Sequence, residues 1–224
     1  MSSQDLMQQM RSSAQDAGSW LEIDAAAFES NVRNLLSMID GRSLLCAVVK
    51  SQAYGHGADL LLPTLVRLGV PFVGVGSNEE AAIARRCGFE GRILRVRAAA
   101  PQEIKAGLCH DIEELVADPQ SAWEMHAIAA EAGKVVRIHL DINSSGISRH
   151  SLDVSSARGR ASAVAIVSHP GLRLAGIMTH FPQDDNSHIE TALVRFQSQA
   201  LALLQLTGVP GRKCFFTAPI PTPR

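Results

Sequence analysis

The chain has 224 residues, of which 46% are hydrophobic and 19% are charged, and its formal net charge is -1. This length and composition allow a sizeable core in one large domain or two small ones. The near-neutral charge excludes a basic surface for nucleic acid or an anionic membrane, and an aromatic content of 4% argues against a surface for stacking bases.

The cysteines and the N-terminal residues indicate in which cell compartment the protein is expected. Cys46, Cys87, Cys109 and Cys214 show no C-x-x-C spacing, which argues against a metal site and against a disulfide framework. No run reaches the ~18 apolar residues of a membrane helix, and the first 19 residues lack the apolar core of a signal peptide. We therefore expect a cytoplasmic protein as the chain is written, and a periplasmic one only if the true N-terminus differs.

The chain begins with a polar segment. Residues 1–19 are expected to be disordered. Residues 20–24, WLEID, alternate between polar and apolar positions and predict a short strand. Residues 25–39 place apolar side chains at helical spacing and predict a helix.

Strands and helices then alternate. Apolar runs predict strands at 44–49, 72–76, 93–96, 135–142 and 172–179, with a weaker strand near 108–116. Helices are expected at 58–69 with Pro63 inside the pattern, at 78–88 with Asn78 as a possible N-cap, at 118–134 with Asp118 as the N-cap, and at 188–208. Apolar strands that alternate with helices are typical of a parallel sheet covered by helices.

Polar residues follow the predicted strands at Lys50, Ser77–Asn78, Arg97, Asn143 and His180. In a (β/α)8 barrel the strand ends of one face build the functional site, and the full barrel typically takes ~250 residues. We count about six strand–helix units. The predicted fold class is therefore α/β, of the (β/α)8 TIM-barrel type, and incomplete with about six strands.

The segment LLCAVVKSQAYGHGADL, at 44–60, carries the clearest chemistry. A lysine that ends an apolar strand is partly desolvated, which lowers its pKa and favours the neutral amine. Such an amine forms a Schiff base with an aldehyde, and pyridoxal phosphate is the common aldehyde cofactor. Gly55 and Gly57 allow close approach of the backbone to a ligand, and Tyr54 offers a hydroxyl donor.

A plainer interpretation stands beside this one. A lone lysine after an apolar strand is usually a charge that reaches solvent. A lone histidine such as His56 is more often a hydrogen-bonding residue than a catalyst. The residue pattern by itself therefore indicates an α/β protein with a lysine at a strand end.

The string AVVKSQAYGHGA resembles the cofactor-lysine signature of alanine racemases. Three further stretches, GVGSNEEAAIARRCGFEGRILRVR, IHLDINSSGISRHSL and IMTHFPQDD, resemble the broad-specificity amino-acid racemase branch of that family. The resemblance covers residues 20–213. It implies a pyridoxal 5'-phosphate enzyme with an N-terminal barrel, a C-terminal β domain, a small-molecule amino-acid substrate and a homodimer.

The resemblance also implies residue roles. Lys50 matches the Schiff-base lysine, which is one of the two racemisation bases, and Tyr54 matches the tyrosine that contacts the cofactor phosphate. Arg149 matches the arginine near the phenolic oxygen, and His180 matches the histidine packed against the pyridine ring. His56 belongs to the same string and is assigned only a supporting role in the loop. Outside this context, Arg149 and His180 would be a loop arginine and a strand-end histidine.

The chain departs from the family in three places. Ser51-Gln52 replaces the usual Ala-Asp after the lysine. The family's second base is a tyrosine on the C-terminal domain, donated across the dimer, whereas this chain has one tyrosine, Tyr54. Residues 214–224, CFFTAPIPTPR, do not match the family and hold three prolines that do not suit a buried strand. We hypothesise a frameshift near 213–215, which leaves an impaired or inactive racemase and weakens the expectation of a homodimer.

Two other functions stay open. Pyridoxal-phosphate homeostasis proteins are single barrels of similar length that hold the cofactor without a known turnover. Alternatively, the chain pairs with intact racemase subunits as an interaction partner.

Overall fold

The computed structural model describes residues 18–39, 41, 43–146, 151–181 and 186–210, together with the backbone of 215–217. Its centre is one sheet of seven strands in the order β1-β2-β3-β4-β5-β6-β7, and every neighbouring pair is parallel. The strands are β1 (Cys46–Val48), β2 (Phe72–Val75), β3 (Arg92–Arg95), β4 (Ile112–Val116), β5 (Val136–Asp141), β6 (Leu172–Met178) and β7 (Phe215–Thr217).

In the described residues one helix precedes β1, and the others follow the strands along the chain. They are α2 (Ala25–Ile39), α3 (Lys50–Tyr54), α4 (Ala58–Arg67), α5 (Asn78–Arg86), α6 (Pro101–Gly107), α7 (Pro119–Glu131), α8 (Ala157–Val167) and α9 (Asn186–Thr207), with a 3-10 turn η1 at Leu108–His110. None of the helices in the described residues is long and apolar enough to span a bilayer.

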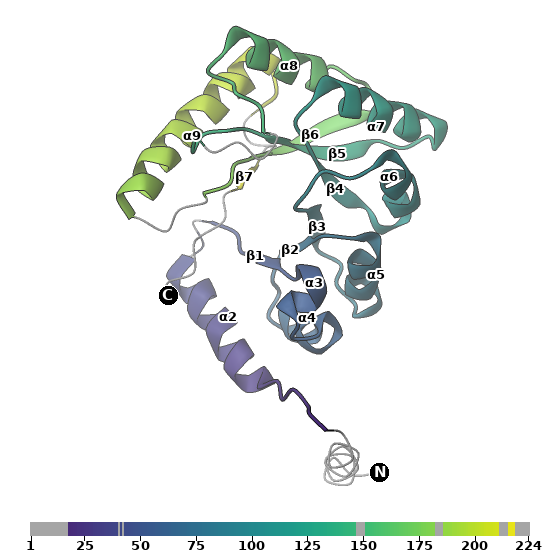
Figure 1. The fold of residues 1–224 in the computed structure, drawn as a ribbon, viewed down its shortest axis with the longest axis vertical. Helices are drawn as coiled ribbons and strands as arrows, with labels where there is room; N and C mark the ends of the chain where they lie inside the picture. The colour runs from purple at the N-terminus through teal and green to yellow at the C-terminus, as the bar shows by residue number, and fades with distance from the viewer. Residues whose placement is uncertain are drawn as a thin grey trace.

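The sheet curls into an arc with helices α4 to α9 along its outer side (Figure 1). β1 and β7 stand at the two ends of the strand order and do not pair with each other in the described residues. The expected barrel-type architecture, incomplete and open, is therefore confirmed. The sheet has one strand more than the roughly six expected, because the short strand β7 pairs with β6.

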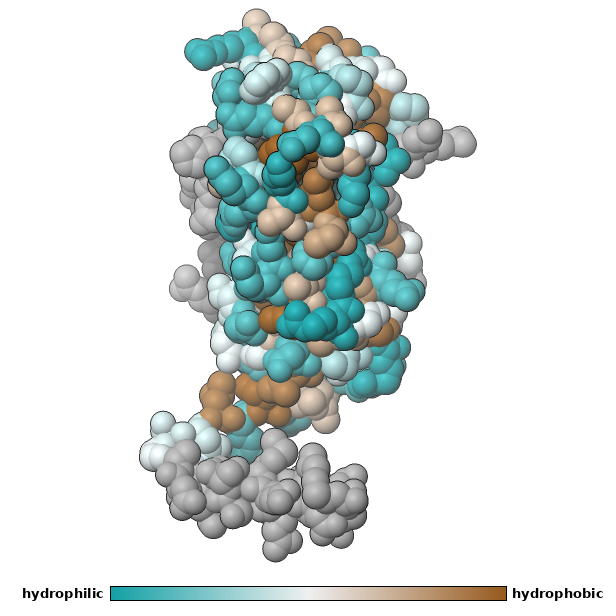
Figure 2. Space-filling model, turned by 90° about the vertical axis from the view of Figure 1, so that its right-hand side faces the viewer, coloured by the Kyte–Doolittle hydropathy of each residue, from teal (hydrophilic) through white to brown (hydrophobic). Residues whose placement is uncertain are grey.

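Two apolar clusters lie between the sheet and the helices. One lies under α4 and α5 and includes Leu62, Val73 and Ile93. The other lies under α7, α8 and α9 and includes Ile138 and Phe196. The outward surface of the helices is largely hydrophilic (Figure 2). Since one side of each strand faces these clusters, the alternate residues of each strand lie on the inner side of the arc.

The inner side carries a buried charged group near the strand starts, which we call the Glu113 cluster (Arg92, Glu113, Arg137 and His139). The Glu113 carboxylate accepts hydrogen bonds from Arg92 Nη2 at 2.6 Å, Arg137 Nε at 2.9 Å and His139 Nε2 at 2.7 Å. Burial opposes ionisation, but the hydrogen bonds from His139 and Arg92 outweigh it and lower the Glu113 pKa to about 2.

Two local predictions are wrong, at residues 20–24 and at the start of α5. Residues 20–24 form no strand, and Asp24 instead accepts hydrogen bonds from the first-turn amides of Ala26 and Ala27, both at 2.9 Å. The N-cap of α5 is Ser77 rather than Asn78, because the Ser77 hydroxyl accepts from the Glu80 amide. Pro63 lies inside α4 without ending it. Asp118 caps α7 as expected.

Candidate active site

The residues expected to form the site do follow strand ends. Lys50 comes two residues after β1, Ser77 and Arg97 come two residues after β2 and β3, and Asn143 and His180 come two residues after β5 and β6. Because all the strands are parallel, these positions share one edge of the sheet. Arg149 and the N-terminal residues 1–17 lie outside the described residues, as does most of the 214–224 tail.

Lys50 is half-buried and opens a left-handed turn. Ser51, Gln52 and Ala53 have φ/ψ of 54°/46°, 55°/48° and 52°/48°, and Tyr54 has φ of 57°. A left-handed conformation costs roughly 1–2 kcal/mol per non-glycine residue. Strain of this kind is retained only where surrounding contacts fix it, and such positions concentrate at functional sites. Gly55 then ends the turn at φ 89°, where glycine carries no penalty.

A carboxylate from the next helix supports this turn. Glu80, which is 8% exposed, accepts hydrogen bonds through Oε1 from Ser51 N at 2.5 Å and through Oε2 from Gly76 N at 2.6 Å. Arg97 Nε donates to the Gly76 carbonyl at 2.6 Å. The backbone beside Lys50 is thus held by side chains that come from the ends of two other strands.

Gln52, which stands where the family has an aspartate, has a defined contact. Its Oε1 accepts from Ala58 N at 3.4 Å, at the start of α4. Gly57, the N-cap of α4, provides no side-chain cap. The Gln52 amide oxygen therefore supplies an acceptor to a helix amide without a charge at this position.

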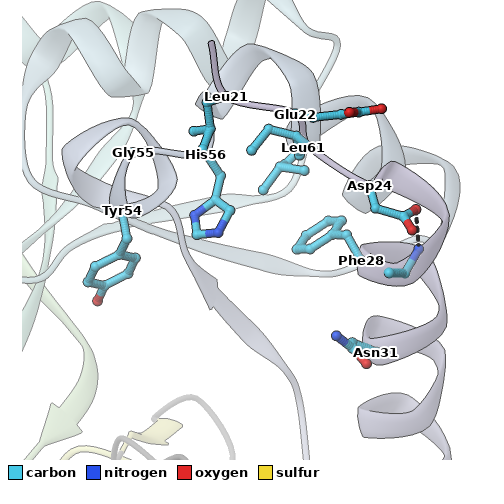
Figure 3. A pocket seen from close by; sticks show the side chains of 11 residues that line it. Leu21, Glu22, Asp24, Phe28, Asn31, Tyr54, Gly55, His56 and Leu61 are labelled. Atoms are coloured by element: carbon cyan, nitrogen blue, oxygen red, sulfur yellow. Dashed lines mark hydrogen bonds between the residues drawn. The ribbon is translucent and has the colours of Figure 1, made fainter. Parts of the chain in front are cut away.

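Tyr54 and His56 lie on different sides of the loop. Lys50 Nζ is 5.8 Å from the centroid of the Tyr54 ring, and Tyr54 is 61% exposed. His56 contacts the Ala53 carbonyl through Nδ1 at 2.8 Å. In Figure 3 the His56 ring points into a hollow of about 560 Å³ bordered by Leu61 and Phe28, whereas the Tyr54 hydroxyl points away from it.

The residues around Lys50 fit one end of pyridoxal phosphate. A Cβ added at Gly76 would lie 3.5 Å from Lys50 Cβ, so the glycine leaves room beside the lysine stem. An amine that can form a Schiff base and a nearby phenol that can donate a hydrogen bond match an aldehyde cofactor that carries a phosphate. Lys50 and Tyr54, both candidate site residues in the sequence, lie close together in the structure.

His180 and its neighbours form the far end of the same edge. His180 is half-buried after β6. The preceding Thr179 is fully buried and donates its hydroxyl hydrogen bond to the Ile142 carbonyl at 2.8 Å. Ser144 Oγ pairs with Gln199 Oε1 at 2.7 Å, which ties the loop after β5 to α9.

Asp141, at the end of β5, is a buried carboxyl that the sequence analysis did not single out. It is 8% exposed, and burial raises its pKa to about 6, although a hydrogen bond from Ser151 opposes the shift. No ion pair involves Asp141 in the part of the chain that the structure describes.

Sequence reasoning also missed Glu80 and Gly76. Glu80 lies in the first turn of α5, where an acidic residue is ordinary. Its proximity to Lys50 arises from strand pairing between β1 and β2, so no local pattern could reveal it.

Comparisons with known proteins agree with this geometry. Residues 23–214 match the family model described as alanine racemase, N-terminal domain. A broad specificity amino-acid racemase of Pseudomonas taetrolens is 44% identical over 199 residues, which cover 89% of this chain and 49% of that protein. A lysine racemase of Proteus mirabilis is 38% identical over 191 residues, which cover 85% of this chain and 47% of that protein.

Among solved structures, the alanine racemase from D-cycloserine producing Streptomyces lavendulae superposes with a TM-score of 0.72 at 29% identity. The match covers 87% of this chain and 51% of that chain. The chain thus spans about half the length of the curated relatives it matches.

Proposed function

Because the chain belongs to the alanine racemase family, whose N-terminal domain it carries, we propose that it supplies the cofactor-holding half of an amino-acid racemase site. The observation that carries this proposal is the half-buried Lys50 at the end of β1, on a strained left-handed turn with Tyr54 beside it. The proposed domain is residues 20–213, and residues 1–19 and 214–224 are proposed to lie outside it.

The proposed cofactor is pyridoxal 5'-phosphate, which when bound would withdraw electrons from the α carbon of an amino acid. Lys50 would hold the cofactor's aldehyde carbon and, when released, would move the α proton at one face through Nζ. Tyr54 would donate its hydroxyl hydrogen bond to the phosphate. His180 would pack against the ring, and Arg149 would lie near the phenolic oxygen.

Racemisation needs a second base on the opposite face of the α carbon. The 224 residues contain one tyrosine, and the proposal assigns it to the phosphate. On their own, these 224 residues are therefore proposed to be impaired or inactive as a racemase. For the whole protein, we further propose an amino acid as the substrate and the homodimer that is typical of the family.

The test is covalent mapping of the cofactor. The chain is incubated with pyridoxal phosphate, reduced with borohydride, digested and examined by mass spectrometry. Four lysines compete for the label, at positions 50, 105, 134 and 213. We expect the label at Lys50 at low cofactor concentration, lost in Lys50→Ala and kept in the control Lys105→Ala. Equal labelling of Lys50 and of the exposed Lys105 would remove Lys50 from its proposed role.

A further inference from the structure

We propose that Glu80 is a positioning residue for Lys50, acting through the left-handed turn at 51–54; this rests on the proposed role of Lys50. Glu80 lies on α5, one strand away from the turn, and reaches it through a buried side chain. It contacts the backbone immediately after Lys50, at Ser51 N and, more distantly, at Gln52 N at 3.4 Å.

The carboxylate serves two strand ends at once. Oε1 accepts from the turn that follows β1, and Oε2 accepts from Gly76 N, which follows β2. The carbonyl of Gly76 accepts a hydrogen bond from Arg97 Nε. Glu80 therefore fixes the relative position of Lys50 and the glycine that leaves room beside it.

The contact also selects the backbone conformation. With Ser51 and Gln52 in the left-handed conformation, both of their amides face Glu80 Oε1, at 2.5 and 3.4 Å. If the acceptor is removed, the two amides lose their partner and the strained turn loses the contact that favours it. The Lys50 amine would then no longer be held at one place.

The backbone of Glu80 is fixed by the N-terminal cap of α5. The Ser77 hydroxyl accepts from the Glu80 amide at 3.3 Å as the N-cap of α5. A glutamine at this position can present an oxygen to only one of the two backbone donors, because its NH₂ group would face the other N–H. Glu80→Gln is therefore a nearly isosteric change that breaks one side of the contact.

The experiment follows the rate of Lys50 labelling by pyridoxal phosphate and borohydride against cofactor concentration. Glu80→Gln is compared with Glu79→Gln, which alters the adjacent, exposed carboxylate. Labelling of Lys105 and Lys134 in the same digest gives an internal reference. Hydrogen exchange of the 51–54 amides, without cofactor, reports the turn independently of labelling.

We expect Glu80→Gln to lower the maximal rate at Lys50 by about tenfold with little change in the half-saturating concentration, and to raise exchange at 51–54. Glu79→Gln should match the parent chain. Adding Ser51→Gly to Glu80→Gln should restore most of the rate, since glycine adopts the left-handed conformation without the Cβ penalty. A purely structural role for Glu80 would not be rescued this way.

The outcomes separate the two proposals. If the parent chain does not label Lys50 preferentially, the proposed function fails, whatever Glu80 does. If the parent chain labels Lys50 and Glu80→Gln labels it equally fast, the positioning role is wrong. A slower rate at all the lysines, or no rescue by Ser51→Gly, would likewise overturn it.

Discussion

Two buried carboxyl groups on the inner side of the sheet have pKa values that are shifted in opposite directions. Glu113, near the start of β4, accepts from two arginines and a histidine, and its pKa falls to about 2. Asp141, at the end of β5, has one hydrogen bond from Ser151, and its pKa rises to about 6. On the inner side, the charge of Glu113 is neutralised by its arginine partners, whereas the Asp141 carboxyl has no ion pair among the described residues.

The contrast suggests different roles for the two ends of the strands: the Glu113 cluster stabilises the sheet, and the opposite edge carries the candidate site. The Glu113 cluster satisfies its groups within the fold, as expected of a region that holds the sheet together. The opposite edge carries Lys50, the strained turn and Asp141. Uncompensated and strained groups are costly to keep, and they concentrate where a ligand completes the site.

The largest expected effect comes from breaking the Glu113 cluster. Glu113→Gln should destabilise the chain by at most about 3–5 kcal/mol, because it removes the carboxylate that the cluster's two arginines and its fully buried His139 share. Urea unfolding at pH 7 measures this. The matched control is Glu131→Gln, which breaks the exposed ion pair with Lys105 and should cost less than about 1 kcal/mol. Equal losses in the two variants would mean that the cluster has no special role.

A smaller effect of opposite sign is expected at Asp141. Its pKa is higher in the folded state than the ordinary value of 3.8, so the folded state binds its proton more tightly. The associated stability is present below pH 3.8 and is lost as the pH rises through about 6. Asp141→Asn should therefore stabilise the chain at pH 7 by on the order of 1–3 kcal/mol, with the gain shrinking toward pH 4. A pH-independent gain would contradict the assigned cause.

The smallest effect concerns the turn itself. Ser51→Gly, at an exposed position with φ of 54°, should raise the free energy of unfolding by about 1 kcal/mol by relieving the left-handed strain. The same substitution at the exposed Ser37 in α2, where the backbone is helical, should lower it by a similar amount. Destabilisation at both positions would show that the turn is not strained.

The sequence predicted the fold well where local patterns are strong. Six strands and the helix at 25–39 were located because apolar periodicity is a local property. The strand predicted at residues 20–24 was wrong because alternation alone cannot show whether a strand has a partner. Lys50 and Tyr54 could be proposed as site residues because their motif is contiguous. Glu80, Gly76 and Asp141 could not, since their contacts depend on how separate strands align.

The most direct test of the account is α-hydrogen exchange in deuterated water by the chain loaded with pyridoxal phosphate. We expect deuterium to enter one enantiomer of the amino acid with retention of configuration, and this exchange to depend on Lys50. The rate of exchange should exceed the rate of racemisation by at least about 100-fold, which is the contribution of one missing base. Inversion as fast as exchange would place a second base within these 224 residues. Exchange that persists in Lys50→Ala, or no exchange in the parent chain, would contradict proton transfer by Lys50 at one face.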